Sequence, residues 1–167
     1  NLLSDPAPDF DQPVAVLKHC HGRIRKQLAT LEKLLGHLPE HGADEQARQA
    51  ATAVLKYFDK AAHLHHEDEE QDLLPMLLAV AQGEDAATLQ ALAPVILQEH
   101  KEMDGMWQDL DEQLTAIAAG RGVQLSASIV RRFVQSYQGS MESEEGIVAT
   151  LELGMLGPEQ MARPGRA

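Results

Sequence analysis

The chain has 167 residues, a single cysteine and a formal net charge of −12, and strong helix formers outnumber aromatic residues. This length predicts one domain with a sizeable core. The acidity argues against nucleic-acid binding and against anionic membrane surfaces, because both need clusters of Lys and Arg. The lone Cys20 excludes an internal disulfide and a cysteine-rich zinc site. The sequence has no run of about 18 apolar residues and no basic, apolar leader, so we expect a cytoplasmic protein without a membrane span.

Glycine and proline residues divide the chain into four segments with helical periodicity, which cover residues 13–38, 44–82, 84–119 and 126–153. Asp11 and Ser126 are N-cap candidates, Pro39 and Gly42 are expected to end the first segment, and Pro75 predicts a kink in the second. No segment alternates apolar and polar residues with the period of a strand. Short connections between long helices favour antiparallel neighbours. We therefore predict an all-α fold, an up-down-up-down antiparallel four-helix bundle.

The same breakers suggest three parts of the chain. We interpret residues 1–12 as an N-terminal extension and residues 13–153 as the bundle. Residues 154–167 are rich in Gly, Pro and Arg, and we interpret them as a flexible C-terminal tail.

Each segment has one apolar stripe at 100° per residue, and polar side chains interrupt every stripe. The interruptions are His21 in the first segment, His65 and Glu69 in the second, His100 in the third, and Ser140 and Glu144 in the fourth. At about 1.5 Å per residue, these positions fall within about one turn of a common level. Two inward carboxylates need positive charge nearby, because an unpaired buried charge costs several kcal/mol. A bound metal ion would supply that charge.

Ordinary structural explanations exist for each of these residues alone. A single His on an apolar stripe is more often a hydrogen-bonded core residue than a ligand, and the acidic residues 67–72 are mostly typical of a solvated face. The agreement among four segments favours a metal site. His19 and His63 fall on outward faces of their helices. His66 lies on a flank about 100° from His65, so its place is ambiguous.

The most specific pattern is the sequence HHEDEEQDLLP at residues 65–75. It resembles the hallmark of the hemerythrin-like HHE cation-binding domains: a His, a Glu pair beginning four residues later, two apolar residues and a Pro. His21, with Ile24, Leu28 and Leu31 after it, is similar to the first-helix pattern of that family. The pair Glu99-His100 is similar to the third-helix pattern. The resemblance covers roughly residues 13–153.

This resemblance implies a four-helix bundle with two irons that are bridged by carboxylates and capped by histidines. The ligands it implies are His21, His65, Glu69, His100 and Glu144, with Glu69 and Glu144 as the bridges. One position departs from the family pattern, since Ser140 stands where the fourth helix normally has a His. Water or His66 would then complete a two-metal site, and a single-metal site is the alternative.

Three functions are compatible with this ligand set, because imidazole and carboxylate suit iron and also manganese or zinc. The resemblance implies a non-haem, di-iron protein that binds or senses O₂ or NO, or senses iron. The first alternative is a di-iron oxidative enzyme, either a ferroxidase or a peroxide-consuming catalyst. The second is a single-metal module for structure or interaction. The expected partners are a small diatomic ligand or peroxide, and the sequence leaves a homodimer open.

Overall fold

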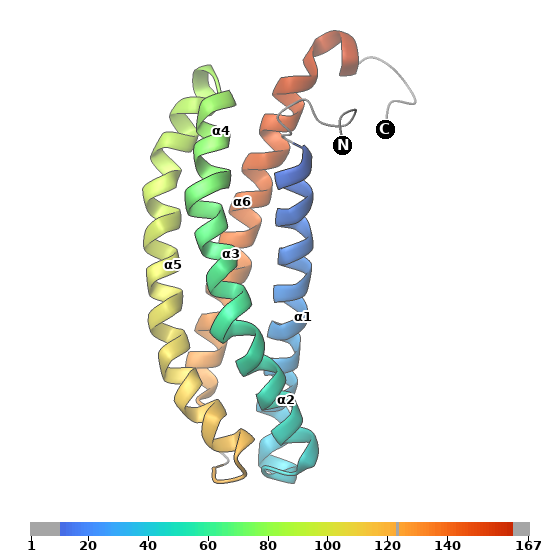
Figure 1. Cartoon of the computed structure of the whole chain (residues 1–167), viewed down its shortest axis with the longest axis vertical. Helices are drawn as coiled ribbons and strands as arrows, with labels where there is room; N and C mark the ends of the chain where they lie inside the picture. The colour runs from blue at the N-terminus through green and yellow to red at the C-terminus, as the bar shows by residue number, and fades with distance from the viewer. Residues whose placement is uncertain (1–10, 123, 162–167) are drawn as a thin grey trace.

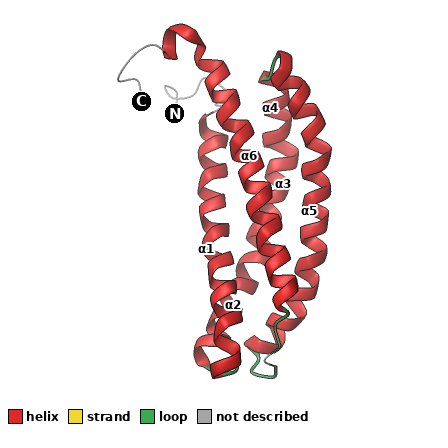
Figure 2. Cartoon of the chain, turned by 180° about the vertical axis from the view of Figure 1, so that it is seen from behind, coloured by secondary structure: helices red, strands yellow, loops and turns green. Residues whose placement is uncertain are grey.

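The computed structural model describes residues 11–122 and 124–161, and its regular structure within these ranges is entirely helical. Four long helical segments lie side by side along the long axis of the molecule (Figures 1 and 2). Three of them are single helices: α1 (Asp11–His41), α5 (Gly83–Ala118) and α6 (Ala127–Met161). The prediction of an all-helical bundle is confirmed.

The second long segment is a run of five consecutive helical elements between the first and third. These are α2 (Glu45–Lys56), the π-helical turn η1 (Tyr57–Ala61), α3 (Ala62–Asp68), the π-helical turn η2 (Glu69–Leu73) and α4 (Leu74–Val80). α1 packs against α2 and α6, and α5 packs against α2, α4 and α6. Each long segment therefore has two neighbours, and the four enclose one interior.

A π turn stands where the sequence predicted a proline kink. In η2 the backbone N–H of Leu74 donates to the carbonyl oxygen of Glu69, five residues back instead of four. Pro75 follows directly, in the first turn of α4. Proline has no N–H and its ring crowds the preceding turn of an α-helix, so a wider turn before it relieves that contact. The π turn also begins at Glu69, one of the predicted ligands.

Two helix ends lie beyond their predicted positions. Pro39 was expected to help end the first segment, but it lies inside α1, which continues to His41. Gly42 ends that helix at φ +66°, a conformation that favours glycine, and its N–H donates to the carbonyl oxygen of Leu38 at 2.8 Å. At the other end of the chain, α6 continues past residue 153 to Met161. The rest of the predicted extension and tail, residues 1–10 and 162–167, lies outside the described residues.

Two clusters of buried apolar side chains fill the bundle. The larger one surrounds the aromatic pair Phe58 and Phe133, whose ring centroids are 5.3 Å apart. The smaller one includes Leu17, Ile96 and Val148. None of the described helices combines the length and the apolar character needed to cross a membrane.

The predicted polar interruptions lie between the two clusters on every long segment. On α1, His21 lies between Leu17 of the smaller cluster and Ile24 of the larger one. On α6, Glu144 separates Met141 of the larger cluster from Val148 of the smaller one. A polar layer therefore crosses the bundle, with apolar packing on both sides of it.

Candidate metal centre

The polar layer consists of side chains from all four long segments, each at most 7% exposed. They are His21 on α1, His65 and His66 on α3, Glu69 on η2, His100 on α5, and Ser140 and Glu144 on α6. All five predicted ligands are in this set. The structure therefore brings together the residues that the sequence placed at one level.

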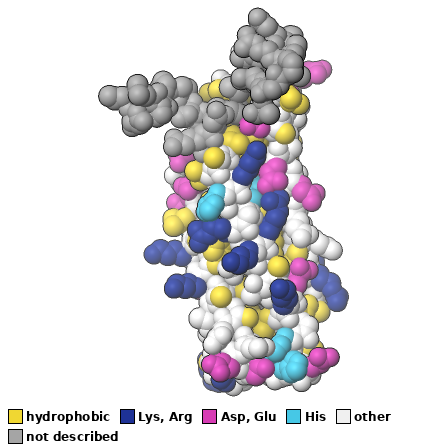
Figure 3. Space-filling view, turned by 90° about the vertical axis from the view of Figure 1, so that its right-hand side faces the viewer, with side chains coloured by type: hydrophobic (Ala, Val, Ile, Leu, Met, Phe, Trp, Pro, Cys, Tyr) yellow, Lys and Arg dark blue, Asp and Glu magenta, His cyan; other side chains and the backbone are white. Residues whose placement is uncertain are grey.

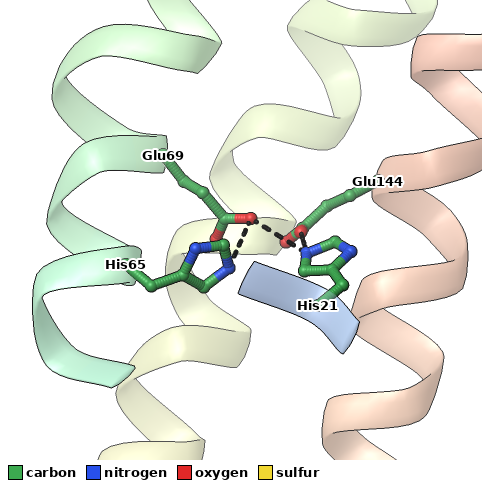
Figure 4. A group of neighbouring side chains, drawn as sticks. All are labelled: His21, His65, Glu69 and Glu144. Atoms are coloured by element: carbon green, nitrogen blue, oxygen red, sulfur yellow. Dashed lines mark hydrogen bonds and ion pairs between the residues drawn. The ribbon is translucent and has the colours of Figure 1, made fainter. Parts of the chain in front are cut away.

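One side of the centre contains two histidines and one oxygen of each carboxylate. Nε2 of His21 lies 3.0 Å from Oε1 of Glu144 and 3.5 Å from Oε2 of Glu69. Nε2 of His65 lies 3.1 Å from the same oxygen of Glu69. Figure 4 shows the two carboxylates pointing toward each other, with the two imidazoles beside them. The ligand atoms of these four residues all lie within 4.8 Å of one another, a spacing that one metal ion could span.

The other oxygen of each carboxylate faces His100. Its Nε2 lies 3.1 Å from Oε1 of Glu69 and 3.6 Å from Oε2 of Glu144. Ser140 contributes to this side only through Glu144, since its hydroxyl donates to Oε2 at 3.1 Å. Glu69 and Glu144 thus each present one oxygen to His21 and the other to His100. Both carboxylates therefore lie between His21 on one side and His100 on the other.

Glu69 lacks the hydrogen bonds that a buried carboxylate normally has. Three histidine nitrogens lie 3.1 to 3.5 Å from its oxygens. None of them is oriented to form a well-shaped hydrogen bond with either oxygen. Buried polar groups are nearly always satisfied, so an unsatisfied carboxylate in this place fits a group that binds a cation.

The outer ring nitrogens of His21 and His100 are each hydrogen-bonded to a further carboxylate. Nδ1–H of His21 donates to Glu145 at 2.7 Å, and Arg25 donates to the same carboxylate at 3.0 Å. Nδ1–H of His100 donates to Glu70, also at 2.7 Å. A carboxylate only accepts, so Nδ1 must bear the proton, and the unshared electron pair of a neutral ring lies on Nε2, toward the centre.

Glu70 and Glu145 are residues of the candidate centre that the sequence interpretation missed. The acidic residues 67–72 were assigned mostly to a solvated face, with Glu69 as a predicted ligand, but Glu70 also contacts the centre through His100. The sequence offered one signal for them. Glu70 directly follows the predicted ligand Glu69, and Glu145 directly follows Glu144. Two consecutive glutamates can serve the metal and its histidine in this way.

The pKa values describe how the centre balances its charge without a metal. Burial alone would lower the pKa of His21, but the carboxylates of Glu144 and Glu69 outweigh it and raise this pKa to about 9. The same competition raises the pKa of His100 to about 10. Burial would raise the pKa of Glu69, yet its neighbours hold it well below the ordinary value, whereas burial raises the pKa of Glu144. Near neutral pH both rings are therefore protonated, and a metal must displace these protons to bind.

His66, which the sequence placed on a flank, is buried in the centre. It is 5% exposed, and its ring stacks on His100 with centroids 3.9 Å apart and planes 8° apart. Tyr137 lies on α6 with its centroid 5.6 Å from that of His66. Burial lowers the pKa of His66 to about 3, so the ring is neutral, and its Nδ1 has no hydrogen-bond partner among the described residues. His19 and His63 are exposed, as predicted.

A small apolar cavity adjoins the carboxylates on the side of the smaller cluster. Its volume is about 10 Å³, comparable to the position of a single water molecule. Glu69 and Glu144 border it, and the surface that the cavity exposes is apolar, with Leu77, Leu89 and Ile96 among its lining. A small uncharged molecule could lie there, next to the centre.

Comparisons with known proteins agree with this geometry. A family model described as the hemerythrin HHE cation-binding domain matches residues 12–151, a range that contains all five predicted ligands. A protein of Haemophilus influenzae, described as uncharacterized, is 27% identical to this chain over 136 residues. The match covers 81% of this chain and 76% of that protein.

His65→Ala and Glu69→Ala should each remove most of the bound metal, because both side chains point into the centre. His19→Ala and His63→Ala should not, since both residues are exposed, His19 on α1 and His63 on α3 beside His65. Elemental analysis of the four purified variants gives the comparison. Equal losses from the outward pair would show that the centre is misassigned.

Glu145→Ala should weaken metal binding about 10- to 100-fold, the usual effect of losing the group that orients a ligating histidine. The matched control is Glu142→Ala on the same helix, because Glu142 is exposed and outside the centre. Competition with a chelator of known affinity measures both variants. If the two bind metal equally well, the contact between Glu145 and His21 does not support the centre.

Proposed function

Because this chain belongs to the hemerythrin HHE cation-binding domain family, we propose that it is a non-haem iron protein that binds or senses O₂, NO or iron. In this proposal Glu69 and Glu144 bridge two irons, and the four long segments alternate in direction, up-down-up-down. One observation carries it: each of the two carboxylates has one oxygen beside His21 and the other beside His100. A site for a single ion would not need this two-sided placement.

The donor atoms favour iron over a structural zinc ion. Structural zinc sites usually have four ligands in a closed tetrahedron and often include cysteine. Here the donors are imidazoles and two shared carboxylates, and Cys20 is only partly buried, with a pKa that burial raises. Such nitrogen and oxygen sites suit iron, with manganese as the nearest alternative. Bound iron would supply a reversible redox couple and a position for a small ligand.

The small apolar cavity supports an uncharged diatomic ligand. It adjoins both carboxylates, and apolar side chains make up the rest of its lining. An ion or a large polar substrate would lose its hydration there without receiving new partners. O₂ and NO are small and nearly apolar, so this cavity would admit them at little cost.

Ser140 supports the second candidate function, a di-iron oxidative enzyme. Its hydroxyl is engaged with Glu144 and replaces an imidazole of the family pattern, which leaves the iron nearest His100 with fewer nitrogen ligands. Catalytic metals keep an open or water-filled position of this kind. The turnover of Fe²⁺ or peroxide by the loaded protein would distinguish this candidate from reversible ligand binding.

Aerobically purified protein should contain iron as its main metal, at close to two atoms per chain, and removal of that iron should lower the melting temperature. A metal that binds only the folded state adds RT ln(1 + [L]/Kd), about 3 to 4 kcal/mol at a hundred- to a thousandfold excess over Kd. Elemental analysis and thermal unfolding before and after chelation test both statements.

Stoichiometric zinc with almost no iron would contradict the iron assignment. An unchanged melting temperature after confirmed metal loss would contradict the centre.

Ser140 stands where the family pattern has a histidine ligand. A separate prediction is that His66 supplies the missing imidazole. His66 is buried against His100, and its Nδ1 is unsatisfied. His66→Ala should then reduce the iron content toward one atom per chain, whereas the exposed control His63→Ala should leave it unchanged. Adding Ser140→His to His66→Ala should restore the second iron. Two irons retained in His66→Ala would mean that water completes the site instead.

A further inference from the structure

An open pocket lies between α1 and the second long segment and reaches the candidate metal centre. Its volume is about 360 Å³. Val16 and Leu17 form the α1 side, and residues of α3 and η2 form the other side. Two of the candidate ligands, His65 and Glu69, are part of its lining. The pocket therefore connects the surface of the bundle with the centre.

The mouth of this pocket is negatively charged on one side only. Asp68 and Asp72 line it, both are exposed, and they lie on successive turns of the same segment. The facing side is apolar, with Val16 52% exposed. Among the described residues that line the pocket there is no Lys or Arg. The mouth thus presents two exposed carboxylates to the solvent.

Glu69 lies at the inner end of this series of carboxylates. It lines the same pocket, is 3% exposed and has no well-formed hydrogen bond at either oxygen. From Asp68 and Asp72 to Glu69, the carboxylates pass from exposed to buried. Hard divalent cations bind oxygen ligands, so successive carboxylates could replace the waters that the ion loses on its way in.

The small apolar cavity described above cannot serve a cation in this way. Its volume is about 10 Å³, and its lining outside the two glutamates is apolar. A hydrated ion is much larger than the single water molecule that the small cavity could hold, so only the larger pocket could admit it. The two openings are therefore suited to different molecules, the larger to an ion and the smaller to an uncharged ligand.

We propose that the larger pocket is the loading route for a divalent cation, and that Asp68 and Asp72 attract the ion and transfer it to Glu69. The cation is Fe²⁺ in the proposed function, on which this inference rests. Two charges at the mouth of a low-dielectric pocket raise the local concentration of cations. Asp68 and Asp72 would therefore control how fast the centre fills, whereas the buried ligands control how much metal it holds.

The test compares rates and final amounts of iron uptake. Chelator-treated, metal-free protein is mixed with Fe²⁺ under anaerobic conditions, samples are stopped with excess chelator at set times, and protein-bound iron is counted. The double variant Asp68→Asn, Asp72→Asn should load about tenfold more slowly than the wild type and reach the same final iron content. The difference should shrink in 1 M salt, where the screening length falls to about 3 Å.

The control removes two negative charges elsewhere. Asp109→Asn with Glu112→Gln changes two exposed residues of α5 that do not line the pocket. This variant should load at the wild-type rate. Equal slowing in both double variants would attribute the effect to overall charge and overturn the proposal. A lower final iron content in the Asp68 and Asp72 variant would also overturn it, because these residues would then belong to the centre itself.

A compensating variant tests the place of the charge. Val16→Glu, added to the slow double variant, returns a carboxylate to the opposite side of the mouth and should restore much of the lost rate. A rate that stays low would overturn the electrostatic role. A wild-type protein that binds no iron would contradict the proposed function, whereas a wild type and a mouth variant that load equally fast would contradict this inference alone.

Discussion

Glu69 and Glu144 face each other in the middle of the bundle, 3% and 7% exposed, and the arrangement around them follows from that fact. Two buried carboxylates without positive partners would cost several kcal/mol each. The bundle places histidines on both sides of the pair, with His21 on one side and His100 on the other. Protons on these rings balance the charge in the metal-free chain, as their raised pKa values indicate. Bound cations would balance the same charge directly.

The polar layer also determines how the apolar core is divided. Because the polar layer takes side chains from all four long segments, each segment interrupts its apolar stripe at the same level, and the core forms two clusters. The larger cluster contains the packed aromatic rings and can hold the helices in place on one side of the centre. The smaller cluster adjoins the carboxylates and provides the lining of the small cavity. Both the small cavity and the open pocket adjoin the centre on the side of the smaller cluster.

Helical periodicity was sufficient to predict that the five candidate ligands are buried at one level, because each lies on an apolar stripe and a stripe turns toward the core in any bundle. It was insufficient for His66. On a regular helix His66 lies about 100° from His65, at the edge of the apolar stripe, and only the packing against His100 and Tyr137 shows that this edge is buried. Periodicity also says nothing about hydrogen bonds from the outer nitrogen of a histidine, so Glu70 and Glu145 were found only in three dimensions.

The second long segment contributes more side chains to the centre than any other. The core-facing stripe of a helix has spacings of three and four residues, so neighbouring positions can both be buried. In this segment His65, His66 and Glu69 are all buried in the polar layer, and Glu70 supports His100. Asp68 and Asp72, in the same stretch, line the open pocket. Residues that would bind the metal, residues that would orient its ligands and residues that would attract it therefore lie within eight consecutive positions. A substitution that converted η2 into a regular α-turn would disturb all three roles together, even if it replaced none of these side chains.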